Sequence, residues 1–100
     1  MSAAHPYLSG KAIILTGGSG DIGSATVRHL LDAGARVAAL DRSAEALGAL
    51  ATAIAAPDRL VTLVTDVTSE ASVAENFAQA RSTFGKIDGI VNAAGIEGRR

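Results

Sequence analysis

The chain reads Thr16-Gly17-Gly18-Ser19-Gly20-Asp21-Ile22-Gly23 directly after the apolar run Ala12-Ile13-Ile14-Leu15, and a helical pattern follows. Gly18, Gly20 and Gly23 have the spacing G-x-G-x-x-G, which between a strand and a helix is typical of a dinucleotide-binding turn. Glycines allow a tight turn and a close approach of the backbone to a pyrophosphate. We predict that N–H groups of the first helical turn, near Ile22, meet the phosphates, because the helix dipole favours negative charge there.

An acidic residue follows this turn at the spacing that the fingerprint requires. Asp41 ends the second apolar run, Arg36-Val37-Ala38-Ala39-Leu40, about 20 residues after the glycines. A carboxylate there accepts hydrogen bonds from ribose hydroxyls and repels a 2′-phosphate, so NAD is favoured over NADP. Arg42 leaves the alternative open, because its guanidinium can pair with a 2′-phosphate if Asp41 turns away.

From about Gly10 to Gly95 the chain resembles the short-chain dehydrogenase/reductase family. The resemblance rests on four segments: the turn Thr16 to Gly23, the acid Asp41, the pair Asp66-Val67, and the run Asn92-Ala93-Ala94-Gly95. It implies that the Asp66 carboxylate accepts from the adenine amino group and that the Val67 backbone meets the ring. It also implies that Asn92, at the start of an Asn-Ala-Gly motif, supports the sheet beside the adenosine ribose.

The turn departs from the family pattern at one position. The family's usual form is Thr-Gly-x-x-x-Gly-x-Gly, and Asp21 stands at its second-to-last glycine, with Gly20 just before it. We predict that Asp21 caps N–H groups at the helix start and complements the helix dipole. Its carboxylate should face away from the ligand, because it would repel a pyrophosphate.

Strands and helices alternate along the whole chain. We predict strands at about 11–16, 36–41, 60–65 and 89–92, and helices at about 22–33, from a Ser43 cap toward Pro57, and 70–84. This alternation predicts an α/β fold of the Rossmann type, a doubly wound parallel sheet with strand order 3-2-1-4 and three crossover helices. We treat residues 1–100 as a single NAD-binding domain with a flexible leader at 1–10.

No catalytic residue is assigned. The resemblance implies that a catalytic Ser, a Tyr-x-x-x-Lys pair and a helical Asn follow the Asn-Ala-Gly motif. Tyr7, the one tyrosine, and Lys11 have the Tyr-x-x-x-Lys spacing, but they precede the glycine turn, so the catalytic roles are not carried over to them. We therefore expect the sequence to be the amino-terminal portion of an oxidoreductase that transfers a hydride between an alcohol or ketone and nicotinamide. The alternative is a dinucleotide-binding or scaffolding module without turnover. A P-loop is excluded, because Ser24-Ala25 follows Gly23 where Lys and Ser or Thr are required.

Composition excludes several other classes. Nine Lys and Arg and ten Asp and Glu are scattered along the chain, so no basic footprint for nucleic acid is present. No cysteine is present, and the two histidines lack companions at ligand spacing, so we predict no metal site. No apolar run approaches the roughly 18 residues of a membrane span. We predict a cytoplasmic protein that forms homo-oligomers, with apolar sheet surface that these 100 residues leave uncovered.

Overall fold

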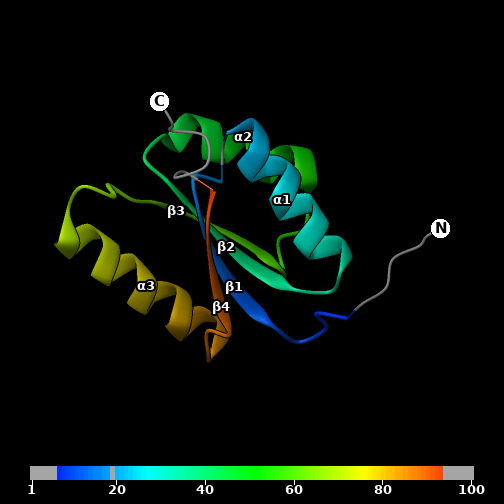
Figure 1. Cartoon of the computed structure of the whole chain (residues 1–100). Coiled ribbons are helices and arrows are strands. Elements are labelled where there is room, and N and C mark those ends of the chain that lie inside the picture. The colour runs from blue at the N-terminus through cyan, green and yellow to red at the C-terminus, as the bar shows by residue number, and fades with distance from the viewer. Residues whose placement is uncertain (1–6, 19, 94–100) are drawn as a thin grey trace.

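The four strands of the sheet are parallel and have the order β3-β2-β1-β4. In a computed structural model, which describes residues 7–18 and 20–93, the elements follow one another as β1 (Ala12–Thr16), α1 (Asp21–Asp32), β2 (Arg36–Asp41), α2 (Ala44–Ile54), β3 (Leu60–Val64), α3 (Glu70–Phe84) and β4 (Gly89–Asn92). Helices α1 and α2 lie on one face of the sheet and α3 lies on the other (Figure 1). The predicted Rossmann topology is confirmed.

The apolar runs of β1 and β2 supply both layers of the core. Successive strand residues point to opposite faces of a sheet. On the face of α1 and α2, a cluster of buried residues comprises Ile13, Leu15, Val27, Leu31, Ala35, Val37, Ala39, Leu47, Leu50, Leu60 and Ala93. On the face of α3, the cluster comprises Ala12, Ile14, Ala38, Leu40, Ala80 and Phe84. The two central strands are therefore buried on both faces, as parallel strands usually are.

The helices begin and end where the sequence provides caps. The Ser43 hydroxyl accepts a hydrogen bond from the Ala46 N–H at 3.1 Å and so caps α2. Gly34 and Gly85, with φ of 98° and 84°, follow α1 and α3 in the left-handed conformation that glycine adopts without strain. Helix α2 ends differently, because its left-handed terminal residue is Ala55, with φ of 53°.

A side chain fixes the pairing of β1 with β4 at their amino ends. Asp88 Oδ2 accepts from the Ala12 N–H at 2.8 Å, and the Asp88 N–H donates to the Ala12 carbonyl at 2.7 Å. Lys86 forms an ion pair with the same carboxylate oxygen at 3.0 Å. The Ala12 N–H, followed by the bond with Lys86, lowers the pKa of Asp88 below its ordinary value.

Strand β4 is less well covered than its neighbours. Ile90 is 57% exposed, whereas Ile14 in the neighbouring β1 is fully buried. Between β4 and α3 lies a groove of about 380 Å³ lined by Ile14, Phe77, Ala78, Arg81, Ile87 and Ile90. The described residues thus leave apolar sheet surface open at this edge, as the sequence predicts. No helix within 7–18 and 20–93 is long and apolar enough to cross a membrane.

Candidate dinucleotide-binding site

The candidate residues converge on one edge of the sheet, although they come from four segments. Because the strands are parallel, their carboxyl ends lie at the same edge, and Thr16 pairs with both Leu40 and Asn92. Asp41 pairs with Val64, which ends β3 just before Asp66. The glycine turn, Asp41, Asp66-Val67 and Asn92 therefore follow adjacent strand ends. Buried Ala93 comes next, while Ser19, Ala94 and Gly95 lie outside the described residues.

The turn after β1 is packed against the end of β2. Gly17 has a φ of 78°, and its N–H donates to the Leu40 carbonyl oxygen at 2.8 Å. The Gly18 N–H donates to the same oxygen at 3.4 Å, and a Cβ at Gly18 would lie 2.8 Å from the Ala39 Cβ. The turn is therefore held by β2, and Gly18 leaves no room for a side chain on that side.

Gly23 brings helix α1 against the same turn. A Cβ at Gly23 would overlap the Gly17 carbonyl oxygen and would lie 2.8 Å from the Gly17 carbonyl carbon. The protein's own backbone occupies the space that a side chain needs. Gly23 therefore sets the close approach of helix and strand, the third of the roles that the fingerprint assigns to its glycines.

Helix α1 presents N–H donors at the carboxyl edge. Its first intrahelical bond runs from the Ser24 N–H to the Gly20 carbonyl at 2.8 Å. The N–H groups of Asp21 and Ile22 make no hydrogen bond with any residue in the described ranges. Such donors, together with the helix dipole, form an anion-binding site. Ile22 is 43% exposed beside them.

The predicted capping role of Asp21 is wrong. Gly20 occupies the cap position with extended backbone, φ −75° and ψ 172°, and the Asp21 carboxylate accepts no hydrogen bond from a helix N–H within the described residues. Asp21 is the first helical residue, so its carboxylate complements the dipole from within the first turn, as predicted. Gly20 lies one position before the place where the family's pattern has its glycine. Gly20 is therefore the N-cap residue, and Asp21 lies inside the helix.

Asp41 and Arg42 extend the edge beyond β2. The Asp41 Oδ1 accepts from the Arg42 N–H at 2.7 Å, which orients the carboxylate. The pKa of Asp66, near the end of β3, is lowered first by its two hydrogen bonds from Thr68 and least by the positive charge of Arg42. The backbone of Arg42 therefore holds the Asp41 carboxylate, whereas its side chain acts only weakly on Asp66.

Asp66 is held by a residue that the sequence analysis missed. Its Oδ1 accepts two hydrogen bonds from Thr68, at 2.6 Å from the hydroxyl and 2.9 Å from the N–H. The Thr68 hydroxyl, then the Thr68 N–H, and to a lesser extent Arg42, lower the pKa of Asp66 below its ordinary value of 3.8. Val67, beside this carboxylate, is 52% exposed. The spacing Asp-x-Thr is typical of a turn in which the Asp side chain bonds to the backbone two residues later. This spacing is the sequence signal that could have identified Thr68.

At the other end of the candidate site, Thr16 joins the last residues of β1 and β4. Its hydroxyl donates to Asn92 Oδ1 at 2.9 Å and lies 3.5 Å from the Val91 carbonyl oxygen. Asn92 therefore contacts the neighbouring strand directly, which agrees with a supporting role in the sheet. The described residues contain no group of three or more His, Cys, Asp or Glu that would hold a metal ion.

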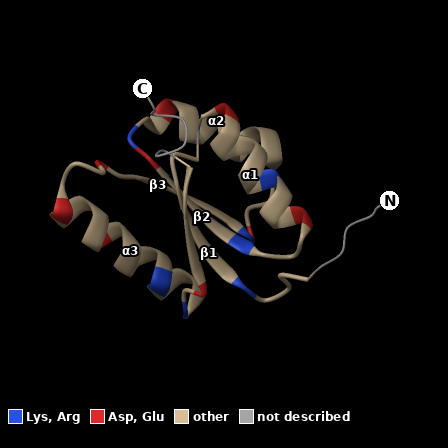
Figure 2. Ribbon diagram, in the orientation of Figure 1, with Lys and Arg blue, Asp and Glu red and all other residues tan. Residues whose placement is uncertain are grey.

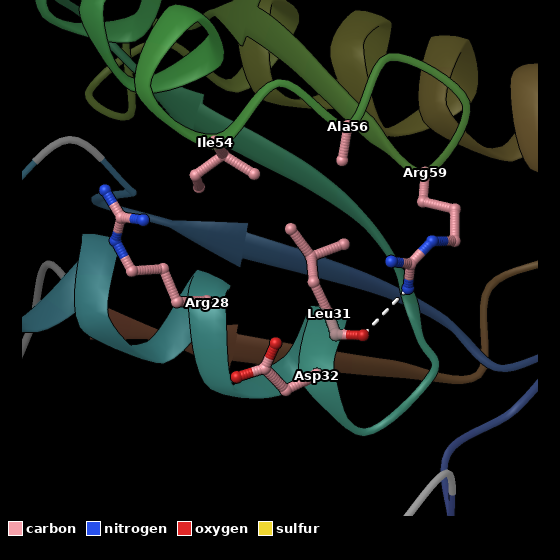
Figure 3. A pocket seen from close by; sticks show the side chains of 6 residues that line it. All are labelled: Arg28, Leu31, Asp32, Ile54, Ala56 and Arg59. Carbon is pink, nitrogen blue, oxygen red and sulfur yellow. Dashed lines mark hydrogen bonds between the residues drawn. The ribbon is translucent and has the colours of Figure 1, made fainter. Parts of the chain in front are cut away.

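A separate hollow of about 240 Å³ lies at the opposite end of α1, lined by Arg28, Leu31, Asp32, Ile54, Ala56 and Arg59. There the Arg59 guanidinium points at the Leu31 carbonyl and donates to it at 2.8 Å (Figure 3). It thereby adds a donor to a carbonyl that already accepts from the Gly34 N–H at 3.0 Å at the end of the helix. None of the candidate dinucleotide-binding residues lines this hollow. Charged residues are dispersed over the described helices, strands and loops (Figure 2).

In this structure a strand, a glycine turn and a helix are followed by acidic residues at the ends of β2 and β3. This arrangement is typical of nucleotide-binding α/β proteins. A family model described as short chain dehydrogenase matches residues 11–100. The chain belongs to the short-chain dehydrogenase family.

Similar proteins include enzymes with different substrates in their names. Levodione reductase of Leifsonia aquatica is 39% identical over 93 residues, which cover 90% of this chain and 35% of that protein. The structure of an NAD⁺-bound xylitol dehydrogenase matches with a TM-score of 0.78 and 34% identity, covering 83% of this chain and 32% of that one.

An NADP-containing relative is also similar. The C-domain of a bacterial malonyl-CoA reductase with NADP matches with a TM-score of 0.81 and 27% identity, covering 90% of this chain and 15% of that one. The chain thus spans about a third or less of the length of these relatives. Both NAD and NADP occur among the similar structures.

Proposed function

We propose that the carboxyl edge of this sheet binds NAD and that the whole protein is an oxidoreductase, which transfers a hydride between an alcohol or ketone and nicotinamide. The observation that carries the proposal is the convergence of four segments of the family's pattern on this one edge. The family membership supports the reaction class. The cofactor supplies the hydride chemistry, and these residues contribute its binding and orientation.

The described residues offer partners for each part of a dinucleotide. The N–H groups of Asp21 and Ile22, which bond to no described residue, suit the pyrophosphate. The Asp41 carboxylate suits the adenosine ribose hydroxyls. Asp66, a carboxylate at neutral pH, accepts from the adenine amino group beside the exposed Val67. Ser19, Ala94 and Gly95 complete the proposed set from outside the described residues.

NAD is the proposed dinucleotide because of how the charges at the ribose end are arranged. A 2′-phosphate would meet the Asp41 carboxylate, which its bond with the Arg42 N–H helps to orient. Arg42 would pair with a 2′-phosphate only if Asp41 turned away from the ribose. The alcohol or ketone substrate, a cytoplasmic location and a homo-oligomeric state remain predictions.

The test is calorimetric titration of the whole protein with NAD and with NADP, followed by turnover assays against a panel of secondary alcohols and ketones. We expect tighter binding of NAD and reduction of NAD by at least one alcohol. Binding without turnover on any substrate would favour the non-catalytic dinucleotide-binding module. If the folded protein bound neither dinucleotide, the proposed function would be wrong.

A further inference from the structure

The two oxygens of the Asp66 carboxylate have different surroundings. Oδ1 accepts both the hydroxyl and the N–H of Thr68, at 2.6 and 2.9 Å. Oδ2 has no hydrogen-bond partner among residues 7–18 and 20–93. An O–H···O⁻ bond of this length is charge-assisted and among the stronger protein hydrogen bonds. Thr68 therefore orients the carboxylate and leaves one oxygen for an external donor.

Helix α3 fixes the backbone on which this carboxylate stands. The Ser72 hydroxyl accepts from the Asp66 N–H at 3.0 Å. Asn76 Nδ2 donates to the Val64 carbonyl at 2.9 Å and to the hydroxyl of buried Thr65 at 2.8 Å. With the backbone held on the amino-terminal side of Asp66, the main freedom left to the carboxylate is rotation of its own side chain. The Thr68 bonds remove that freedom.

A second feature beside Asp66 fits a flat base. The Val67 side chain is 52% exposed, and it follows directly after a carboxylate that has an open oxygen. A large apolar side chain in water next to a fixed acceptor combines a contact surface with a hydrogen-bond acceptor, the two elements of a small-molecule site. An ionised carboxylate accepts from an amino group and repels a carbonyl oxygen.

We propose that Thr68 is a positioning residue that sets the base selectivity of the dinucleotide site. By holding Asp66 Oδ1, it directs Oδ2 toward the exocyclic amino group of adenine, so that the site rejects a purine with a carbonyl at that position. This inference rests on the proposed function and deepens it. A purine with a carbonyl at that position would place its oxygen against the Asp66 carboxylate. A site that accepts a hydrogen bond from a ligand discriminates strongly against a ligand that lacks the donor.

The ionisation of Asp66 depends on the same contact. The Thr68 bonds lower its pKa, so the carboxylate is present above that pKa and selectivity is lost as the pH falls through it. When the hydroxyl is removed, the pKa moves back toward 3.8 and selectivity is lost at a higher pH. A purely structural role for Thr68 does not predict this coupled change.

The experiment compares the affinities of the whole protein for NAD and for nicotinamide hypoxanthine dinucleotide, which has a carbonyl in place of the adenine amino group. We expect the wild-type protein to prefer NAD. Thr68→Val and Thr68→Ala should each reduce the ratio of the two affinities about three- to ten-fold, as expected for loss of a bond to a charged group. Thr68→Ser, which keeps the hydroxyl, should retain the ratio.

Thr83→Val is the matched control. The Thr83 hydroxyl donates to the Gln79 carbonyl at 2.9 Å near the far end of α3, so its removal should leave the affinity ratio unchanged. An NMR titration of the Asp66 carboxyl should show a raised pKa in Thr68→Val and Thr68→Ala but not in Thr68→Ser. This measurement needs no ligand, so it separates the orientation of Asp66 from its use in binding.

The outcomes distinguish the two proposals. Equal losses of both affinities in folded Thr68→Val, or an Asp66 pKa that does not change, would overturn the positioning role and leave the proposed function in place. A wild-type protein that binds both dinucleotides equally would do the same. Failure of the wild-type protein to bind either one would refute the proposed function and this inference with it.

Discussion

Replacement of Gly23 by alanine tests the tight packing of α1 on the turn after β1. A Cβ at this position would overlap the Gly17 carbonyl oxygen and lie 2.8 Å from the Gly17 carbonyl carbon. Ordinary contact begins at 3.4 Å, so relief of the contact with the carbonyl carbon alone would need a separation of about 0.6 Å, and the overlap with the oxygen would need more. This separation would move the N–H groups of Asp21 and Ile22 relative to the turn.

The magnitude follows from two opposing terms. Overpacking of a close-packed site costs about 1–3 kcal/mol of the free energy of unfolding. Alanine in place of glycine inside a helix recovers about 0.5–1 kcal/mol. We expect Gly23→Ala to be destabilising by about 1–2 kcal/mol, since the clashing atoms are backbone and cannot rotate away. The affinity for NAD should fall at least about ten-fold, because donors held in one geometry are displaced together.

The matched control is Gly48→Ala in α2. A Cβ at Gly48 would meet nothing within 4 Å, so only the helix-propensity gain remains and this variant should be slightly more stable than the wild type. Urea unfolding followed by circular dichroism gives the free energies of unfolding, and calorimetry gives the NAD affinities. If Gly23→Ala were as stable as Gly48→Ala and bound NAD like the wild type, the packing argument would be refuted.

The remaining predictions concern the ribose acid, the sheet edge, a helix end and the isolated chain. Asp41→Ala should reduce the difference between the NAD and NADP affinities measured by calorimetry. Asp58 is an exposed acid in the α2–β3 loop, so Asp58→Ala should leave that difference unchanged. Equal affinities in the wild type would show that Asp41 does not select the dinucleotide. The fold lowers the pKa of Asp88, so its carboxylate stabilises the folded protein above the unfolded pKa, and this contribution is lost as the pH falls through the folded pKa. The free energy of unfolding of Asp88→Asn should therefore decrease less than that of the wild type below about pH 4. Ala55→Gly should raise the free energy of unfolding by up to about 1 kcal/mol, because Ala55 has a φ of 53°; a loss of stability would contradict this. The isolated 100-residue chain, with Ile90 exposed on β4, should self-associate in size-exclusion chromatography with light scattering and show no turnover; a well-behaved monomer would contradict the first expectation.

Most of the fold could be predicted from the sequence because its signals are local. Gly34 and Gly85 mark helix ends, and Ser43 marks a helix start, each through the conformation or hydrogen bond of a single residue. The strand order follows from the alternation of elements and the right-handed crossover rule. The bounds of β2, α3 and β4 agree with the prediction, and β3 ends one residue earlier than predicted.

The candidate site was less predictable because its details depend on which atoms meet. The hydrogen bonds of Thr68 to Asp66, and of Asn76 across the end of β3, join residues whose approach is set by the packing of α3. The capping role predicted for Asp21 was wrong because capping depends on a one-residue shift in where the helix begins. Sequence spacing identifies the candidate ligand-binding residues better than it identifies the residues that hold them.

One carbonyl group links two parts of the candidate site. The Leu40 oxygen accepts from the Gly17 N–H, and the peptide unit to which it belongs continues into Asp41. A peptide unit is planar and rigid, so a displacement of the turn is transmitted to the backbone that carries the ribose acid. Substitutions made to exchange one dinucleotide for the other should therefore be non-additive with substitutions in the turn. Cofactor engineering at Asp41 would need to be carried out jointly with the glycine turn rather than after it.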